Sequence, residues 1–166
     1  MPLTSVTTDA ATLTLTVVGD YPVPPQRLWD AFADARQLER FWGPPTWPAT
    51  FTRHDMRVGG RAEYFLTGPK GERWSGSWKF TAVNPISSFE AQDGEDNAED
   101  ENMPSAMKFT FEATPTGSRM IGVTQFPSLE AMEQVARGME EGLRAAMPQL
   151  DAVLVEPSAA AAPASR

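Results

Sequence analysis

The chain has 166 residues, of which 41% are hydrophobic and 22% charged, and this is the composition of an ordinary globular protein with one domain. Its formal charge of −8 argues against nucleic acid or an anionic membrane as a partner, because both favour a basic surface. The absence of cysteine excludes disulfides and thiolate chemistry. No stretch of about twenty apolar residues is present, and the first residues lack the pattern of a signal peptide, so we expect a cytoplasmic protein without a membrane span.

Short patterns along the chain predict strands and two small helices before one long helix. Alternation of apolar and polar residues, as in Thr12 to Val18, has the period of two expected of a half-buried strand. Gly68-Pro69 and similar pairs separate such stretches, as hairpin turns do. In chain order we expect a strand at 12–18, helices at 26–33 and 34–41, strands at 49–54, 61–66, 73–83, 87–92, 106–113 and 118–126, and a helix at 128–154.

The last helix carries the longest apolar pattern in the chain. At 100° per residue its apolar side chains share one sector about 120° wide, so it needs a broad apolar surface to pack on. Ser128 is expected to be its N-cap, and Pro148 falls on the polar face, where a bend is easiest to accommodate. Gly138 and Gly142 are interpreted as positions where a strand or loop approaches the helix closely.

Hairpin-linked strands with segregated helices indicate an α+β domain built on an antiparallel sheet. A strongly curved sheet would give the last helix its packing surface. We place this domain at 12–155 and expect flexible tails at 1–11 and 156–166, because these segments are small, polar or low in complexity.

A set of aromatic residues and methionines has two interpretations, a packed core or the walls of a ligand pocket. In the second, Tyr64 and the indole N–H of Trp78 would orient a guest. The set consists of Trp29, Trp42, Trp47, Tyr64, Trp74, Trp78, Phe89, Met107, Phe109, Phe111, Met139 and Met147.

Polar candidates for chemistry are scattered. His54, the sole histidine, is interpreted as a surface or strand-end residue, and the alternative is a general base at a pocket mouth. Four charged residues alternate with apolar ones along the expected strands: Arg61, Glu63, Arg73 and Arg119. They are interpreted as ion pairs on an outer face of the sheet, and the alternative is a buried arginine that orients a carboxylated ligand.

The acidic stretch Asp93 to Glu101 lacks the glycine and the final glutamate of an EF-hand loop. We therefore expect a solvated hairpin loop there rather than a calcium site. The sequence predicts no metal site and no cofactor.

Several motifs together resemble one protein family. Residues 21–29, YPVPPQRLW, resemble the first strand-to-helix passage of the activator of Hsp90 ATPase homologue 1-like (AHSA1-like) proteins, which belong to the SRPBCC, or START/Bet v 1-like, superfamily. Residues 41–45, FWGPP, are similar to the family's W-W-G-P segment, and residues 58–61, VGGR, to its P-G-G-x turn. Residues 126–128 and 138–143 resemble the entry into its last helix and its G-M-x-x-G-W block.

The resemblance implies a helix-grip fold, in which a curved seven-stranded antiparallel sheet wraps a long C-terminal helix, two short helices accompany it, and a cavity lies between sheet and helix. Ala62 and Leu143 stand where the family often carries larger residues, which could enlarge that cavity. The residues expected to line it are Leu28, Trp29, Phe32, Trp42, Trp47, Ala62, Tyr64, Trp74, Trp78, Phe89, Met107, Phe109, Phe111, Met139, Leu143 and Met147.

The first functional hypothesis is binding of a hydrophobic or amphipathic small molecule in that cavity. One alternative is a cyclase- or hydrolase-like enzyme that uses the same cavity, with His54, Glu63, Tyr64 and Arg73 as its candidate residues. Another is a stress-related module that docks on a chaperone or other protein through an apolar patch around Trp42 to Trp47. The oligomeric state is left open, with a homodimer as one alternative.

Overall fold

The computed structural model describes residues 3–93 and 105–156. The three helices and seven strands expected from the sequence are present, as α1–α3 and β2–β8, and the expected acidic loop lies almost entirely outside the described residues. In chain order the elements are β1 (Leu3–Asp9), β2 (Thr14–Tyr21), α1 (Pro25–Ala33), α2 (Ala35–Trp42), β3 (Ala49–His54), β4 (Arg61–Thr67), β5 (Arg73–Asn84), β6 (Ser88–Asp93), β7 (Ala106–Thr114), β8 (Gly117–Gln125) and α3 (Leu129–Leu154).

Strand β1 was not expected. The prediction of a flexible tail before residue 12 is wrong for residues 3–9, which pair antiparallel with β2 and give the sheet an eighth strand. Val6 lies opposite Val17 in this pairing and is only 6% exposed. The sequence signal was weak because Val6 is flanked by serine and threonines, so the alternation that marks the other strands is missing.

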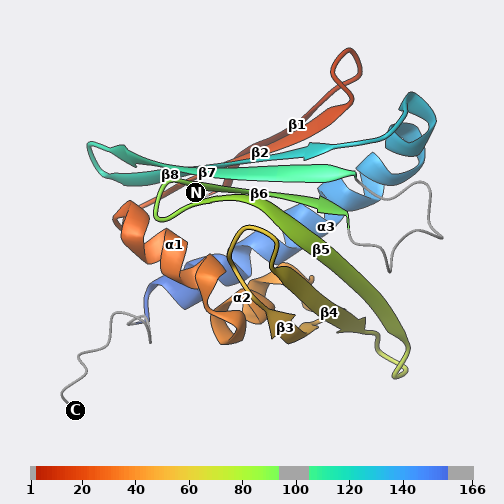
Figure 1. Cartoon of the computed structure of the whole chain (residues 1–166), viewed down its shortest axis with the longest axis horizontal. Coiled ribbons are helices and arrows are strands. Elements are labelled where there is room, and N and C mark those ends of the chain that lie inside the picture. The colour runs from red at the N-terminus through yellow and green to blue at the C-terminus, as the bar shows by residue number, and fades with distance from the viewer. Residues whose placement is uncertain (1–2, 94–104, 157–166) are drawn as a thin grey trace.

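All eight strands form one antiparallel sheet in the order β1-β2-β8-β7-β6-β5-β4-β3. The twelve-residue strand β5 joins its two halves, and its pairing with β6 shifts register between Phe80 and Ala82. Such a bulge bends a strand and increases its twist. Figure 1 shows the result, a strongly curved sheet in which β3 and β4 turn away from the long β2, β7 and β8.

The three helices lie on the concave face and close the core. Side chains that point inward from the strands, such as Leu15 and Val17 of β2, form one buried cluster with Leu28 of α1 and Leu150 of α3. Helix α2 also covers the free edge of β3. There the Phe51 carbonyl accepts a hydrogen bond from Arg36, and the Phe51 N–H donates to Glu39, which blocks this edge against further strand pairing.

Helix α3 has 26 residues and crosses the molecule diagonally, from the end of β8 to the two short helices (Figure 1). Ser128 is its N-cap, as expected, and its hydroxyl accepts the N–H of Ala131 at 3.1 Å. Pro148 is exposed, as its place on the polar face predicted. None of the helices within the described ranges is long and apolar enough to cross a membrane.

The close approach expected at the two glycines of α3 does not occur within the part of the chain that the structure describes. A Cβ atom added at Gly138 or at Gly142 would meet no atom of the described residues within 4 Å. That expectation is therefore wrong for residues 3–93 and 105–156, which leave space beside both glycines.

Candidate functional site

One half of the concave face is a packed aromatic core. The Phe32 ring lies 5.1 Å from the Phe109 ring, and Phe89 stacks on Phe109 at 5.3 Å. Trp29 meets Phe111 edge to face at 6.1 Å. Rings at these distances touch, which leaves no room for a guest between them. Of the residues expected to line the cavity, the buried ones are Leu28, Trp29, Phe32, Ala62, Trp78, Phe89, Phe109, Phe111 and Met147.

The other half carries aromatic rings that remain partly open to solvent. Trp42, at the end of α2, lies 4.8 Å from the Trp78 ring and 6.2 Å from the Tyr64 ring, and Trp74 lies 6.1 Å from Tyr64. Trp42, Tyr64 and Trp74 are half-buried, whereas Trp78 beneath them is 6% exposed. These four residues form what we call the aromatic wall, drawn from α2, β4 and β5.

Helix α3 shows the same change from buried to half-buried along its core-facing stripe. Met132 near its start and Leu150 near its end are buried, whereas Met139 and Leu143 between them are only half-buried. At 100° per residue, Leu143 points within about 20° of the direction shared by Met132 and Leu150. The rotation of the helix therefore does not explain the exposure of Leu143, which depends instead on what lies opposite the centre of the helix.

Helix α3 packs its backbone closely on only some of the neighbouring elements. The helix lies close to β1, β2, α1 and α2, and within the described residues it has no comparable contact with β3 to β7. The aromatic wall stands on β4 and β5, together with the end of α2. Met107 of β7 is also half-buried and packs at the margin of the core. Apart from Trp42 of α2, the half-buried residues of the aromatic wall and of β7 thus belong to elements that do not pack their backbones closely on α3.

One buried donor in the aromatic wall has no partner among residues 3–93 and 105–156. The indole Nε1–H of Trp78 is shielded from solvent and finds no hydrogen-bond acceptor among the described residues. Such orphaned groups are uncommon in folded proteins, because their loss of water is not compensated. Trp78 thus combines two features of a ligand contact, an apolar ring and an unused polar atom.

The remaining member of the expected cavity, Trp47, has a different role. It is half-buried and its ring covers Gly68, where an added Cβ would lie 2.7 Å from the Trp47 ring. Trp42 and Trp47 are both half-buried rather than exposed, whereas docking through residues 42–47 would require an exposed apolar patch.

The polar residues proposed for an enzyme are not brought together. Glu63 forms ion pairs with Arg53 and Arg61 at 3.6 and 3.3 Å, and the Arg73 guanidinium lies 4.2 Å over the Phe65 ring. Arg119 pairs with Asp20 at 2.7 Å. These positions alternate with the inward-facing ones, so the prediction of ion pairs on the outer face is confirmed for Arg61, Glu63 and Arg119.

His54 ends β3 and acts as a structural bridge. Its Nε2 lies 2.8 Å from the carbonyl oxygen of Phe32, which can only accept, so Nε2 carries the proton. Burial lowers the pKa of His54, opposed in part by the Phe32 hydrogen bond and by the charges of Asp34 and Asp55. The ring packs against Phe51 at 5.8 Å. These contacts support the strand-end interpretation over the general base.

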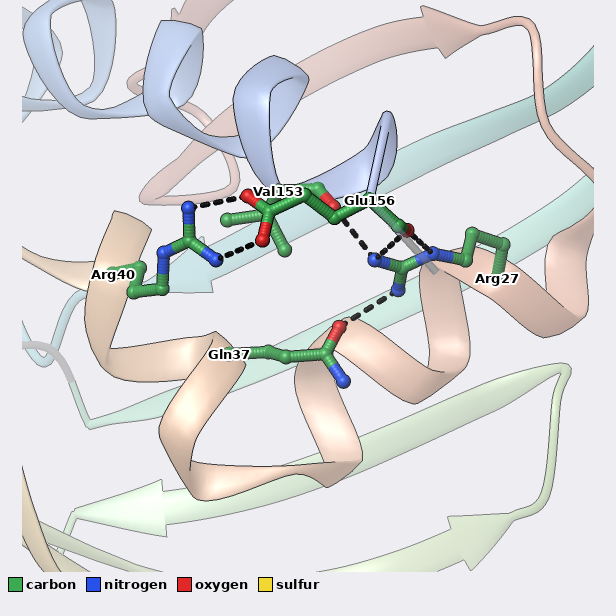
Figure 2. A network of polar contacts seen from close by, with 5 residues as sticks. All are labelled: Arg27, Gln37, Arg40, Val153 and Glu156. Carbon is green, nitrogen blue, oxygen red and sulfur yellow. Dashed lines mark hydrogen bonds and ion pairs between the residues drawn. The ribbon is translucent and has the colours of Figure 1, made fainter. Parts of the chain in front are cut away.

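A polar network missed by the sequence analysis holds the end of α3. Arg27 of α1 donates to the carbonyl oxygens of Val153 and Glu156 at 2.6 and 2.9 Å and to the side chain of Gln37 at 2.7 Å (Figure 2). Arg40 pairs with the Glu156 carboxylate at 2.6 Å. Cationic side chains at a helix C-terminus donate hydrogen bonds to its last carbonyl groups and interact favourably with the negative end of the helix dipole. The network therefore joins α3 to α1 and α2.

An open depression of about 490 Å³ lies beside this network, away from the aromatic wall. None of the residues expected to line a cavity belongs to it. Its lining residues are Val23, Pro24, Gln26, Arg27, Asp30, Leu154, Val155 and Glu156.

Comparisons with known proteins agree with this fold. The chain is similar to protein Ms6760 of Mycobacterium smegmatis, with 43% identity and a TM-score of 0.81 over 93% of this chain and 98% of that one. It is also similar to a protein from Arthrobacter aurescens, with 40% identity and a TM-score of 0.84 over 98% and 97% of the two chains. An AHSA1-like protein from Aeromonas hydrophila, 16% identical over 86% of this chain and 95% of its own, shares the fold with a TM-score of 0.70. The curated proteins give no match.

The family assignment follows from the extent of the match. Residues 22–155 fit the family described as "Activator of Hsp90 ATPase homolog 1-like protein", and they include the three helices and six of the eight strands, β3 to β8. Proteins of this fold generally bind ligands. The chain is a member of the activator of Hsp90 ATPase homologue 1-like family.

Proposed function

We propose that this protein binds a hydrophobic or amphipathic small molecule between the centre of α3 and the aromatic wall. The observation that carries the proposal is the half-burial of Met139 and Leu143 in the middle of a stripe that is buried at both ends. Apolar side chains on the core side of a helix are covered when the space beneath them is filled. A bound molecule would complete their burial.

The energetics favour a guest of modest size. Covering about 200 Å² of apolar side-chain surface would contribute about 5 kcal/mol at about 25 cal/mol per Å², before the entropy of association is subtracted. The rings of Trp42, Tyr64 and Trp74 supply most of the wall, and the unbranched side chains of Met107 and Met139 can adapt to different shapes. Such a site selects its ligands by their size and apolar surface more than by one particular arrangement of polar groups.

Methionine methyl groups allow a direct test. In a protein labelled with ¹³C at the methionine ε-methyls, a neutral naphthalene probe should shift the signals of Met107 and Met139. Met120, which is fully buried, and Met56, which is half-buried outside the aromatic wall, serve as internal controls and should not shift. Saturable shifts that spare Met107 and Met139 would place the binding elsewhere and contradict the proposal.

A second experiment looks for the natural ligand. Native mass spectrometry of protein purified from its own host should reveal a co-purifying molecule of a few hundred daltons, a size that matches common ligand pockets. The Leu143→Trp variant, which fills the space beneath α3, provides the matched control and should lose that molecule. A molecule retained equally by both proteins would indicate another site.

A further inference from the structure

One atom of the aromatic wall, the indole nitrogen of Trp78, restricts which chemical groups the ligand can carry. Trp78 is 6% exposed, and its Nε1–H has no acceptor among the residues that the structure describes. The ring is surrounded by other rings, with Trp42 at 4.8 Å, Tyr64 at 5.5 Å and Phe51 at 5.7 Å. An indole N–H can only donate. A molecule that completes this site therefore gains most if it presents an acceptor to Nε1–H.

Basic side chains near the aromatic wall in sequence are directed elsewhere. Arg61 pairs with Glu63 at 3.3 Å, and Arg73 lies over the ring of Phe65. Lys79, which follows Trp78, is exposed on the opposite face of β5. Among the described residues, the inward face of β4 and β5 thus offers no positive charge. A carboxylate placed there would lose its hydration without gaining an ion pair, which is strongly unfavourable.

A cationic ligand is disfavoured for a different reason. Aromatic cages hold a cation against the faces of several rings that stand apart. Here the centroids of Trp42, Tyr64 and Trp78 are 4.8 to 6.2 Å apart, so the rings contact one another and leave no cage between them. The N–H of Trp78, the positive end of its bond dipole, would also repel a positive charge placed against it.

The geometry points to an uncharged, flat apolar ligand whose carbonyl or ether oxygen accepts a hydrogen bond from Trp78 Nε1–H. This inference rests on the proposed function and adds the charge and the polar group of the ligand to it. Apolar burial supplies affinity, and the single donor fixes which end of the molecule lies against β5.

Three probes of equal shape test the inference in the full chain: 2-ethylnaphthalene, 2-acetylnaphthalene and 2-naphthoate. The first has no acceptor, the second has a neutral carbonyl, and the third has a carboxylate. Their dissociation constants at pH 7.5 can be compared by calorimetry or by methyl NMR. We expect 2-acetylnaphthalene to bind about five- to tenfold more tightly than 2-ethylnaphthalene, the gain of one buried hydrogen bond, and 2-naphthoate to bind most weakly.

Trp78→Phe separates the donor from the ring. It should remove the advantage of the acetyl over the ethyl probe while the ethyl probe still binds, whereas Trp74→Phe on the same strand and face should preserve that advantage. Equal affinity of the acetyl and ethyl probes for the native protein, or tightest binding of 2-naphthoate, would overturn the inference and leave the proposed function intact. Failure of all three probes to bind would overturn the proposed function itself.

Discussion

Tyr64 of β4 lies across Gly76 of the neighbouring strand β5. The two residues are opposite each other in the sheet, and a Cβ added at Gly76 would approach the Tyr64 hydroxyl oxygen to 2.5 Å and a Trp74 ring carbon to 3.0 Å. The missing side chain of Gly76 is therefore what allows both aromatic residues to lie flat against the sheet. The absence of a side chain at Gly76 thus determines how Tyr64 and Trp74 pack in the aromatic wall.

Gly76→Ala should disturb the aromatic wall without unfolding the protein. The added methyl must displace the Tyr64 ring, which is half-buried and has solvent on one side to move into. We expect binding of 2-acetylnaphthalene to weaken several-fold, with a loss of stability of about 1–3 kcal/mol from overpacking. Chemical denaturation and calorimetry measure the two effects. Unchanged affinity would show that Tyr64 does not contribute to the site.

Gly138→Ala and Gly142→Ala should each stabilise the protein. Neither added methyl would contact another described residue, and alanine favours a helix over glycine by about 0.8–1 kcal/mol. The midpoint of urea unfolding should therefore rise for each variant. A fall in the midpoint would instead indicate that some segment approaches these glycines, as their G-x-x-x-G spacing had suggested.

Arg27→Met should loosen the end of α3 and destabilise the protein by about 1.5–3 kcal/mol. The half-buried guanidinium donates to the carbonyls of Val153 and Glu156 and to Gln37, and the substitution leaves those acceptors unpaired. Thermal and urea unfolding provide the measurement.

Arg40→Met is the matched control for that variant. Its ion pair with Glu156 is also short, at 2.6 Å, but both side chains are about half exposed, at 46% and 50%. Exposed pairs contribute about 0–1 kcal/mol. Equal losses in the two variants would show that the ion pair, and not the capping of α3, holds the helix end.

Stability should fall between pH 7 and pH 5 in a manner that depends on His54. Burial places the folded-state pKa of His54 below the ordinary value of 6.5, so the unfolded chain binds this proton more readily than the folded protein does. The stabilisation is fully present above pH 6.5 and is lost as the pH falls toward the folded pKa. The difference in unfolding free energy between native protein and His54→Gln should shrink as the pH falls from 7 to 5. A difference that stays constant or grows would contradict this pKa direction.

Much of the fold could be predicted because its signals are local. Met107, Phe109 and Phe111 alternate with polar residues and form β7, and the capping residue Ser128 precedes α3 as expected. Their patterns persist in the structure because each strand buries one face and each helix one stripe. β1 shows the limit of this reasoning, since a strand of mostly polar residues depends on its neighbour β2 for its position.

The site could be predicted only in part, because burial depends on what lies opposite. Phe109 and Met107 are two residues apart on the same face of β7, yet Phe109 packs among rings and Met107 is half-buried. No local pattern distinguishes them. Arg27 was missed for a related reason, since its acceptor Val153 is 126 residues away and is a backbone carbonyl. Of the two departures noted at Ala62 and Leu143, only Leu143 borders the uncovered centre of α3.

A larger side chain at Leu143 tests the central claim most directly. Leu143→Trp should be accommodated in the space beneath α3, so that the free energy of unfolding is unchanged or raised and binding of 2-acetylnaphthalene is lost. Leu150→Trp, on the same stripe but at a fully buried position, should lose about 1–3 kcal/mol or more from overpacking. Equal destabilisation of the two variants, measured by urea unfolding, would show that Leu143 is packed as tightly as Leu150 and would contradict a ligand site between the helix and the sheet.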